Sequence, residues 1–331
     1  MHYVGIDLHK RFLVAAREDE TGNSRGTVSF NCRDVLAIHS HFEALRPFTC
    51  VIEASSSYRW LYNLLSPLGE VKLAHPLRLK AMVSGRAKTD KLDAALLAKL
   101  LRADLIPMAY IPPASYCELR EVARSRARLS RRMTEAKNEL HALLMRNNLY
   151  PPYKSTFSKS ATRWLRQLQL GNGNELVKEE LLDRIEYFRS QLKHWEGELV
   201  KLHEAFPQVD ALLDIHGVGL YSALLIVGEI GEPWRFSNAK QVGTYAGLTA
   251  RVNQSGDRCR HGNISRQGSP WLRWVLVQIA MKVVRRDQRL NNFYTRVRKR
   301  SSSKKARVGV ARKLAGICWV RLKQWHREVA N

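Results

Sequence analysis

The chain has 331 residues, and 55 Lys and Arg against 30 Asp and Glu give it a formal net charge of +25. That length allows two or three compact domains, and so large a positive excess calls for a polyanionic partner, of which nucleic acid is the leading candidate. Five scattered cysteines without a Cys-x-x-Cys pair argue against a disulfide framework or a zinc cluster, and the longest apolar run, 223–227, is far too short to cross a bilayer. We therefore expect a reduced, cytoplasmic protein without a signal peptide or a membrane segment; a ribosome-associated or merely soluble basic protein is the bland alternative.

The first region, residues 1–110, alternates short apolar segments typical of strands with segments typical of helices. Three strands in meander order come first, and helices and strands then alternate as far as a helix rich in Leu and Ala. The expected strands are 2–7, 11–17, 26–30, 49–52 and 71–74, and the expected helices are 35–45, 58–65 and 91–101. This order predicts a mixed α/β sheet, and Pro107, Pro112 and Pro113 mark the linker that follows it.

The second region, residues 114–204, is predicted to be helical with heptad-like spacing. Apolar residues recur every three or four positions in two stretches separated by Pro151 and Pro152, and Arg126 is the one misfit. The two seams are Leu119, Val122, Arg126, Leu129, Met133, Ala136, Leu140 and Leu143, and Leu181, Ile185, Phe188, Leu192, Trp195, Leu199 and Leu202. The pattern fits an antiparallel helical hairpin, a coiled coil that pairs two chains, or an ordinary helical bundle.

The third region, residues 205–331, is predicted to be mainly helical. Between positions 251 and 315 there are only two acidic residues, so this stretch is the expected footprint for DNA or RNA. The turn IHGVG, which holds Gly217 and Gly219, precedes an expected helix at 221–229 and resembles the turn of helix-hairpin-helix modules, whose glycines let backbone N–H groups approach a phosphate. A Gly-x-Gly turn is equally typical of a tight connection.

Four carboxylates have the pattern of a metal site. Asp7 and Glu53 each end an expected strand, and Asp90 and Asp93 stand three residues apart on one face of an expected helix. Four gathered carboxylates repel one another unless cations are present, and Mg²⁺ prefers such oxygen ligands. Two such ions, about 3.5–4 Å apart, can activate an attacking oxygen and stabilise a leaving one. The structural alternatives are Asp90 as a helix N-cap, Asp93 as a partner of the helix dipole, and Asp7 as a surface residue.

Segments at both ends of the chain carry a resemblance. GIDLHK, VIEAS and AKTDKLDA resemble the N-terminal RuvC-like (RNase H fold) domain of DEDD transposases, a group that includes the Piv invertases and the IS110 family of insertion sequences, whose members are described as bridge-RNA-guided recombinases. IHGVG, LLIVGEIGEPWRFSNAKQVGTYAGLTARVNQSG and GNISRQGSPWLR resemble the C-terminal transposase domain of the same group. The resemblance implies an RNase H-like domain at 1–110, a coiled-coil domain at 114–204 and a mainly α transposase domain at 205–331.

Carried over position by position, the resemblance makes Asp7, Glu53, Asp90 and Asp93 the ligands of Mg²⁺. It makes Ser255 the nucleophile that forms a phosphoserine link to DNA, although Gln254 stands where the family often has a further serine. A serine needs activation by a base or a metal, and neighbouring arginines would stabilise the phosphorane. The expected nucleic-acid-binding residues are Gly217, Gly219, Arg251, Arg258, Arg260, Arg266, Arg273, Arg285, Arg286, Arg298, Lys299 and Arg300.

Other residues near Ser255 are weaker candidates for catalysis. His261 is a possible base, but a lone histidine is more often structural, and Ser265 and Ser269 occupy helix-capping positions before an expected helix at 271–281. Tyr245 would suit a tyrosine recombinase but stands in an apolar stretch typical of a core. Composition alone also makes the Ser255 segment a good loop.

Three functions remain open at this level. The first is a Mg²⁺-dependent recombinase that acts through Ser255 on DNA, with a guide RNA implied by the resemblance alone. The second is a junction-resolving nuclease without a covalent intermediate, and the third is a non-catalytic nucleic-acid-binding dimer. The heptad seams favour a homodimer, and holding two duplexes would suit a tetramer. One active site could combine both ends of one chain or of two.

Overall fold

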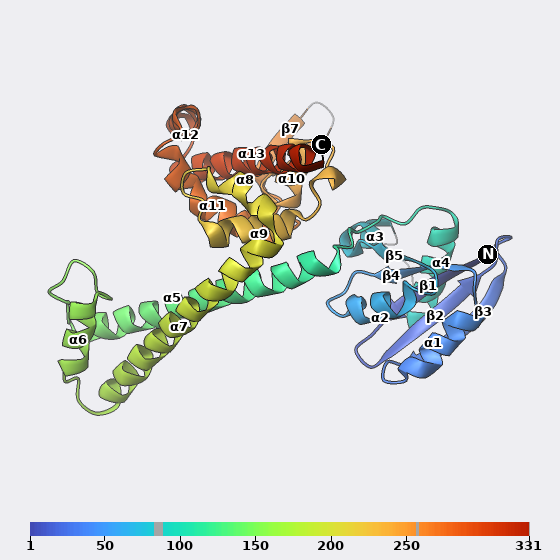
Figure 1. Cartoon of the computed structure of the whole chain (residues 1–331), viewed down its shortest axis with the longest axis horizontal. Coiled ribbons are helices and arrows are strands. Elements are labelled where there is room, and N and C mark those ends of the chain that lie inside the picture. The colour runs from blue at the N-terminus through green and yellow to red at the C-terminus, as the bar shows by residue number, and fades with distance from the viewer. Residues whose placement is uncertain (83–88, 256–257, 331) are drawn as a thin grey trace. The chain divides into compact units, whose positions relative to one another are not determined.

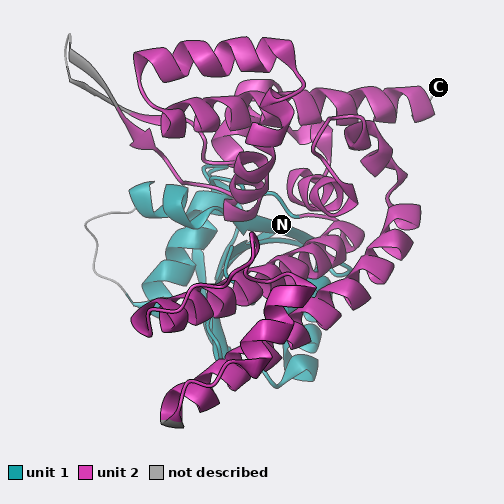
Figure 2. Cartoon of the chain, turned by 90° about the vertical axis from the view of Figure 1, so that its left-hand side faces the viewer, with its two compact units in different colours: residues 1–111 teal, residues 112–331 magenta. Residues whose placement is uncertain are grey.

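The computed structural model describes residues 1–82, 89–255 and 258–330 (Figure 1). The chain divides into two compact units, residues 1–111 and 112–331 (Figure 2). The three domain ranges predicted above stay a prediction, since this division does not bear on the boundary at 204. No helix among the described residues is long and apolar enough to span a bilayer.

A five-stranded mixed sheet forms the centre of unit 1. Its strands are β1 (His2–Leu8), β2 (Phe12–Glu18), β3 (Ser24–Asn31), β4 (Phe48–Glu53) and β5 (Glu70–Ala74). They lie in the order β3-β2-β1-β4-β5, and the first three form an antiparallel meander while β4 and β5 run parallel to β1. The predicted mixed sheet is thus confirmed, with all five strands in the expected places.

Helices cover both faces of this sheet. The helices are α1 (Val35–Ala44), α2 (Tyr58–Leu65), α3 (Pro76–Met82) and α4 (Asp90–Arg102). Successive side chains of a strand point to opposite faces; Cys50 and Ile52 therefore pack in one core with α1 and α2, while Val51 packs in another with Leu97 of α4. Burial on both faces explains why β4 is buried without a break from Phe48 to Ile52 and is mostly apolar.

Two long helices begin unit 2. Helix α5 (Ala114–Arg146) and helix α7 (Asn172–Ala205) pack side by side, with the short α6 (Lys159–Gln167) between them in sequence (Figure 1). The C-terminal part of the α5 seam and the N-terminal part of the α7 seam are buried in a common core. Its residues are Ala136, Leu140, Leu143, Leu144, Leu165, Leu181, Leu182 and Ile185. The two seams therefore pair within one chain, and pairing between two chains stays a prediction.

The N-terminal half of α5 packs against other parts of unit 2 and does not follow the continuous seam that the heptad pattern predicts. Leu129 and Met133 are half-exposed, whereas Leu119 and Ala123 are buried against the rest of unit 2. The misfit Arg126 places its guanidinium 4.0 Å from the centre of the Tyr221 ring, a cation–π contact. The polar residue at this seam position therefore has a specific aromatic partner.

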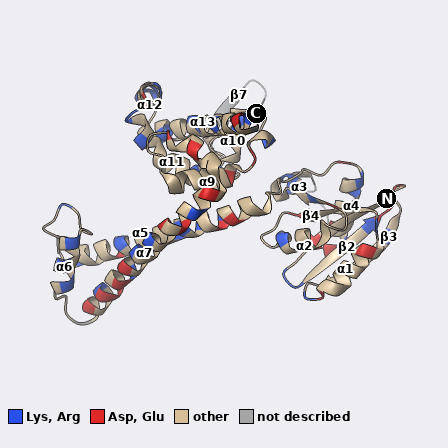
Figure 3. Cartoon of the chain, in the orientation of Figure 1, with Lys and Arg blue, Asp and Glu red and all other residues tan. Residues whose placement is uncertain are grey.

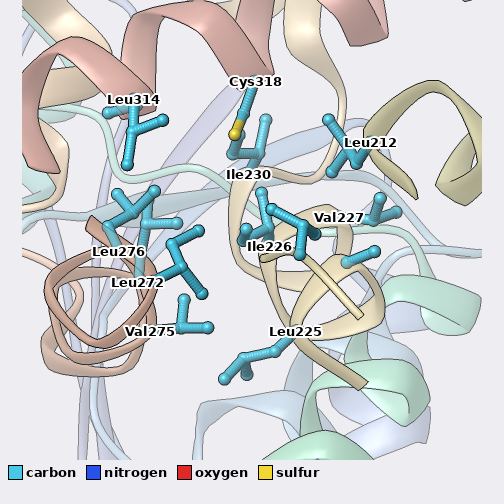
Figure 4. Packing of buried hydrophobic residues seen from close by; sticks show 14 of the residues in the cluster. Leu212, Leu225, Ile226, Val227, Ile230, Leu272, Val275, Leu276, Leu314 and Cys318 are labelled. Atoms are coloured by element: carbon cyan, nitrogen blue, oxygen red, sulfur yellow. The ribbon is translucent and has the colours of Figure 1, made fainter. Parts of the chain in front are cut away.

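The remainder of unit 2 is a helical bundle with one small hairpin. Its elements are the 3-10 helix η1 (Pro207–Val209), α8 (Asp210–Leu213), α9 (Leu220–Ile230), the 3-10 helix η2 (Pro233–Arg235), α10 (Ala239–Tyr245), the antiparallel strands β6 (Ala250–Ser255) and β7 (Arg258–Ile264), α11 (Pro270–Val284), α12 (Gln288–Arg300) and α13 (Ser303–Ala330). Helix α9 is buried from Ala223 to Ile230. Figure 4 shows Ile226 and Val227 of α9 with Leu276 of α11 and Cys318 of α13 in the same apolar cluster.

Candidate functional site

The carboxyl ends of β1 and β4 bring two of the predicted ligands to one edge of the sheet. Ile6 of β1 pairs with Ile52 of the parallel strand β4. Asp7 and Glu53 are the next residue on each strand, so the register makes them neighbours at this edge. Parallel neighbours present their carboxyl ends on the same side, which is the arrangement that the sequence predicted for these two residues.

Helix α4 brings the other two acidic residues because Gly5 lets it lie directly on β1. A Cβ atom at Gly5 would lie 2.1 Å from the Ala94 carbonyl oxygen and 2.4 Å from the Ala98 nitrogen, so no larger residue fits there. Thr89 caps α4 by accepting a hydrogen bond from the Leu92 N–H at 3.3 Å. The cap alternative for Asp90 is therefore wrong, and both Asp90 and Asp93 occupy the first turn of the helix.

A histidine that the sequence argument did not select joins two of these acids. The Nε2 atom of His9 lies 3.0 Å from Asp7 Oδ2 and 3.3 Å from Asp90 Oδ1, and its ring stacks on Phe12 with centroids 4.6 Å apart. One ligand atom each from Asp7, His9 and Asp90 fall within 4.8 Å of one another. The signal in the sequence is position alone, since His9 follows Asp7 by two residues at the end of the strand.

The electrostatics of Asp7 fit a cation site. Burial raises the pKa of the Asp7 carboxyl most, Asp90 and Asp93 raise it further, and contact with His9 opposes the shift. Asp93 therefore lies near enough to act on Asp7 electrostatically, although it is outside the group of three ligand atoms. A divalent ion would relieve both the repulsion and the loss of solvation. The carboxylate oxygens suit Mg²⁺ and Mn²⁺, whereas an imidazole nitrogen is a more usual ligand of metals such as Zn²⁺.

The predicted nucleophile ends the first strand of the β6–β7 hairpin. Ser255 pairs with Arg258, and Val252 pairs with His261. The side chains at 252–255 and 258–261 lie outside the described residues, and so do residues 256 and 257. The predictions for the side chains of Ser255, Arg258 and Arg260 therefore remain predictions.

The base of this hairpin is tied to the helical bundle by several hydrogen bonds. The Ser265 N–H donates to the Thr249 carbonyl at 2.8 Å, and Arg273 donates to the carbonyls of Ala246 at 3.1 Å and Arg266 at 3.3 Å. Ser269 caps α11 as expected, with Leu272 N 3.1 Å from its hydroxyl. Ser265 does not cap α11; its backbone N–H instead bonds across the base of the β6–β7 hairpin. The predicted phosphate ligand Arg273 thus supports the hairpin.

A buried glutamate connects this hairpin base to the long helix α5. Glu229 of α9 is fully buried and accepts hydrogen bonds from Arg124 Nε at 2.7 Å and Arg124 Nη2 at 3.0 Å. It also accepts one from the hydroxyl of Ser269 at 2.7 Å. A buried carboxylate is tolerated only with such partners. Because Ser269 also donates its N–H to the Tyr245 carbonyl, the network fixes the segment after β7 relative to α5.

The remaining predicted nucleic-acid-binding residues are two glycines next to α9 and a set of exposed cations. Gly217 has a positive φ of 86° and packs against Lys282, and Gly219 caps α9 with open space around it. Arg251 donates to the Ser265 carbonyl at 3.4 Å and is exposed. The other exposed cations of the prediction are Arg266, Arg285, Arg286, Arg298, Lys299 and Arg300. Tyr245 packs with Phe236 and Arg235 in the core, as expected.

Comparison of the sequence with known proteins relates the chain to transposases. Residues 4–148 match the model of the DEDD transposase domain of IS110-type elements, and residues 209–295 match the model described as transposase of the IS116/IS110/IS902 family. Together the two models span well over half of the chain. The protein is a transposase of the IS110/IS116 family.

Several curated relatives align over nearly the whole chain. A probable family 20 transposase of Pseudomonas aeruginosa is 26% identical, with 96% of each chain covered. The transposase for insertion sequence element IS1328 of Yersinia enterocolitica is 25% identical and covers 96% of this chain and 95% of its own. The pilin gene-inverting protein of Moraxella lacunata is 23% identical over 97% of this chain and 96% of its own. The resemblance inferred from short segments thus extends through the helical middle.

Proposed function

We propose that this transposase cleaves and exchanges DNA strands of its insertion sequence through a Mg²⁺-dependent reaction at Ser255. The observation that carries the proposal is the gathering of Asp7, His9 and Asp90 at one edge of the sheet, with Glu53 and Asp93 beside them. Bound divalent ions would lower the pKa of an attacking hydroxyl and neutralise charge on the phosphate.

In the proposed step the Ser255 oxygen forms a bond to phosphorus while the bond from phosphorus to a deoxyribose oxygen breaks. The serine proton passes to a base, and the leaving oxygen is released as a hydroxyl after gaining a proton. Arg251, Arg258, Arg260 and Arg266 would stabilise the charge of the phosphorane. In the reverse step a second DNA hydroxyl attacks the phosphoserine, which joins the new strand and frees the serine.

The carboxylates belong to unit 1 and the serine to unit 2, so we propose that one active site combines the two, from one chain or from two. A homodimer paired through α5 and α7, or a tetramer on two duplexes, would supply the second copy. We also propose that a structured RNA of the same element guides the choice of DNA, which rests on the resemblance to guided recombinases.

Strand cleavage by two single variants separates this proposal from its alternatives. Purified protein is incubated with Mg²⁺, a duplex carrying the element ends and the flanking non-coding RNA, and nicked strands are quantified. Ser255→Ala and Asp7→Ala are each expected to abolish cleavage. Full cleavage by Ser255→Ala with none by Asp7→Ala would establish a nuclease that uses water, and full activity in an Asp7→Ala, Glu53→Ala double variant would establish a non-catalytic binding protein.

A further inference from the structure

We propose that a groove between α10, α12 and α13 of unit 2 binds the backbone of duplex DNA. The groove encloses about 1870 Å³ and is also bordered by the end of α8 and by Thr249. Seven cations line it; one of them, Arg321, pairs with Asp214. The other six are Lys240, Arg286, Arg289, Arg296, Arg312 and Lys313. We refer to it below as the α10–α13 groove. Only Arg286 of this set was predicted individually as a binding residue, while Arg289, Arg296, Arg312 and Lys313 fall in the 251–315 stretch predicted as the nucleic-acid footprint.

The charge of the α10–α13 groove is uncompensated. All six cations are exposed, and none has an ion-pair partner among the side chains that the structure describes. The two acidic residues that line the groove are already engaged: Asp214 pairs with Arg321 at 3.3 Å, and Asp287 caps α12 through the Leu290 N–H at 3.0 Å. Lys and Arg are frequent along α12 (Figure 3). So many unpaired cations in one concave surface are a binding site for a polyanion.

The lining favours a duplex over unpaired bases. Sites for single strands combine cations with aromatic faces on which bases stack. Among the groove-lining residues that the structure describes, only Phe293 and His216 carry aromatic rings. Phe293 is half-buried, and the Lys313 amine lies 4.7 Å from its ring centre, while His216 is exposed. The surface therefore offers many cations and few aromatic faces, which suits a phosphate backbone whose bases are paired.

The α10–α13 groove lies next to the hairpin that carries the proposed nucleophile. Thr249, which lines the groove, directly precedes strand β6, whose last residue is Ser255. A duplex held in the groove therefore lies at the base of the serine hairpin. The choice of DNA as the occupant rests on the proposed function, whereas the binding of a duplex backbone rests on the groove itself.

Binding without catalysis tests this inference. Affinity of the full chain for a 20-base-pair DNA duplex is measured by fluorescence anisotropy in EDTA at several salt concentrations, for the wild type and for the triple variant Arg286→Ala, Arg289→Ala, Arg312→Ala. The slope of log K against log salt is expected to fall by about 1 for each lost phosphate contact, so by about 3. A matched triple variant of exposed cations elsewhere in unit 2, Arg132→Ala, Lys154→Ala, Lys193→Ala, is expected to keep the wild-type slope.

Two further arms complete the test. The variant Arg286→Lys, Arg289→Lys, Arg312→Lys keeps the charge and is expected to retain affinity, which distinguishes lost binding from lost folding. Single-stranded DNA and duplex RNA of the same sequence are expected to be less sensitive to the alanine triple variant than duplex DNA. Two results would overturn the inference. One is an equal loss of salt slope in the two alanine triple variants, and the other is a larger loss of affinity for single-stranded DNA or duplex RNA than for duplex DNA. Because no metal is present, these results are independent of whether Ser255 is the nucleophile.

Discussion

The acidic cluster of unit 1 and the cationic surface of unit 2 are assembled in different ways. In unit 1 the register of two parallel strands and one closely packed helix gathers the carboxylates, and each of them stands at an element end that the sequence marks. In unit 2 the groove cations come from α10, α12, α13 and the turn before α12, which packing brings together. Runs of basic residues therefore predict a DNA-binding region but not its surface, whereas patterns at strand ends predict the individual acidic residues of the proposed metal site.

The largest expected loss of stability comes from breaking the buried hydrogen-bond network of Glu229. Replacing Glu229 by Ala leaves Arg124 partly buried without its carboxylate and removes the partner of Ser269, so we expect a loss of about 3–5 kcal/mol. The measurement is urea unfolding at neutral pH. Glu139→Ala, which breaks an exposed pair with Arg184, is the control and should cost less than about 1 kcal/mol; equal effects would show that the network contributes no more than a surface pair.

The next effect concerns the close packing of α4 on β1. Gly5→Ala places a methyl group against the backbone of α4, and overpacking of this kind costs about 1–3 kcal/mol. We also expect a loss of metal affinity, because Asp90 and Asp93 move with α4. Isothermal calorimetry and urea unfolding measure the two effects. Gly197→Ala, at an open position inside α7, should instead stabilise the chain by about 0.5–1 kcal/mol; a harmless Gly5→Ala would contradict the packing argument.

The strand ends of unit 1 and the buried Glu229 of unit 2 show which parts of the molecule the sequence could predict. The alternation of apolar segments predicted all five strands, and Asp7 and Glu53 followed from the ends of those strands. Glu229 was part of an apolar helix in the prediction, and nothing in its own position distinguishes a buried acid from an exposed one. Its partner Arg124 lies more than a hundred residues away, so only the tertiary structure reveals the pair.

Two smaller features illustrate the same limit. Arg126 broke the heptad pattern, and the reason is the ring of Tyr221, which comes from a different helix. His9 was missed because a histidine beside a predicted metal-binding aspartate has no distinct spacing rule, and its contact with the acidic cluster depends on where Asp90 of α4 lies. In both cases the side chain acts on a partner distant in the chain.

A smaller effect is expected from pH on unit 1. The pKa of Asp7 is raised in the folded protein, so the folded state holds this proton at a pH where the unfolded state has released it. The contribution of Asp7 to stability is therefore present below its ordinary pKa and is lost as pH rises through the raised value. Urea unfolding in EDTA should show that Asp7→Asn is more stable relative to the wild type at pH 7 than at pH 4. A difference independent of pH would contradict this, and addition of Mg²⁺ should reverse the order by stabilising the wild type alone.

The most direct test of the whole account is the identity of the residue that becomes attached to DNA. The protein is incubated with Mg²⁺, the element ends and the flanking RNA, denatured and digested, and DNA-linked peptides are sequenced by mass spectrometry. We expect attachment at Ser255 in the wild type and no adduct in Asp7→Asn, because the proposed reaction needs the metal ion that the carboxylates would hold. Cleaved DNA with no linked peptide, attachment at Tyr245, or an undiminished Ser255 adduct in Asp7→Asn would contradict it.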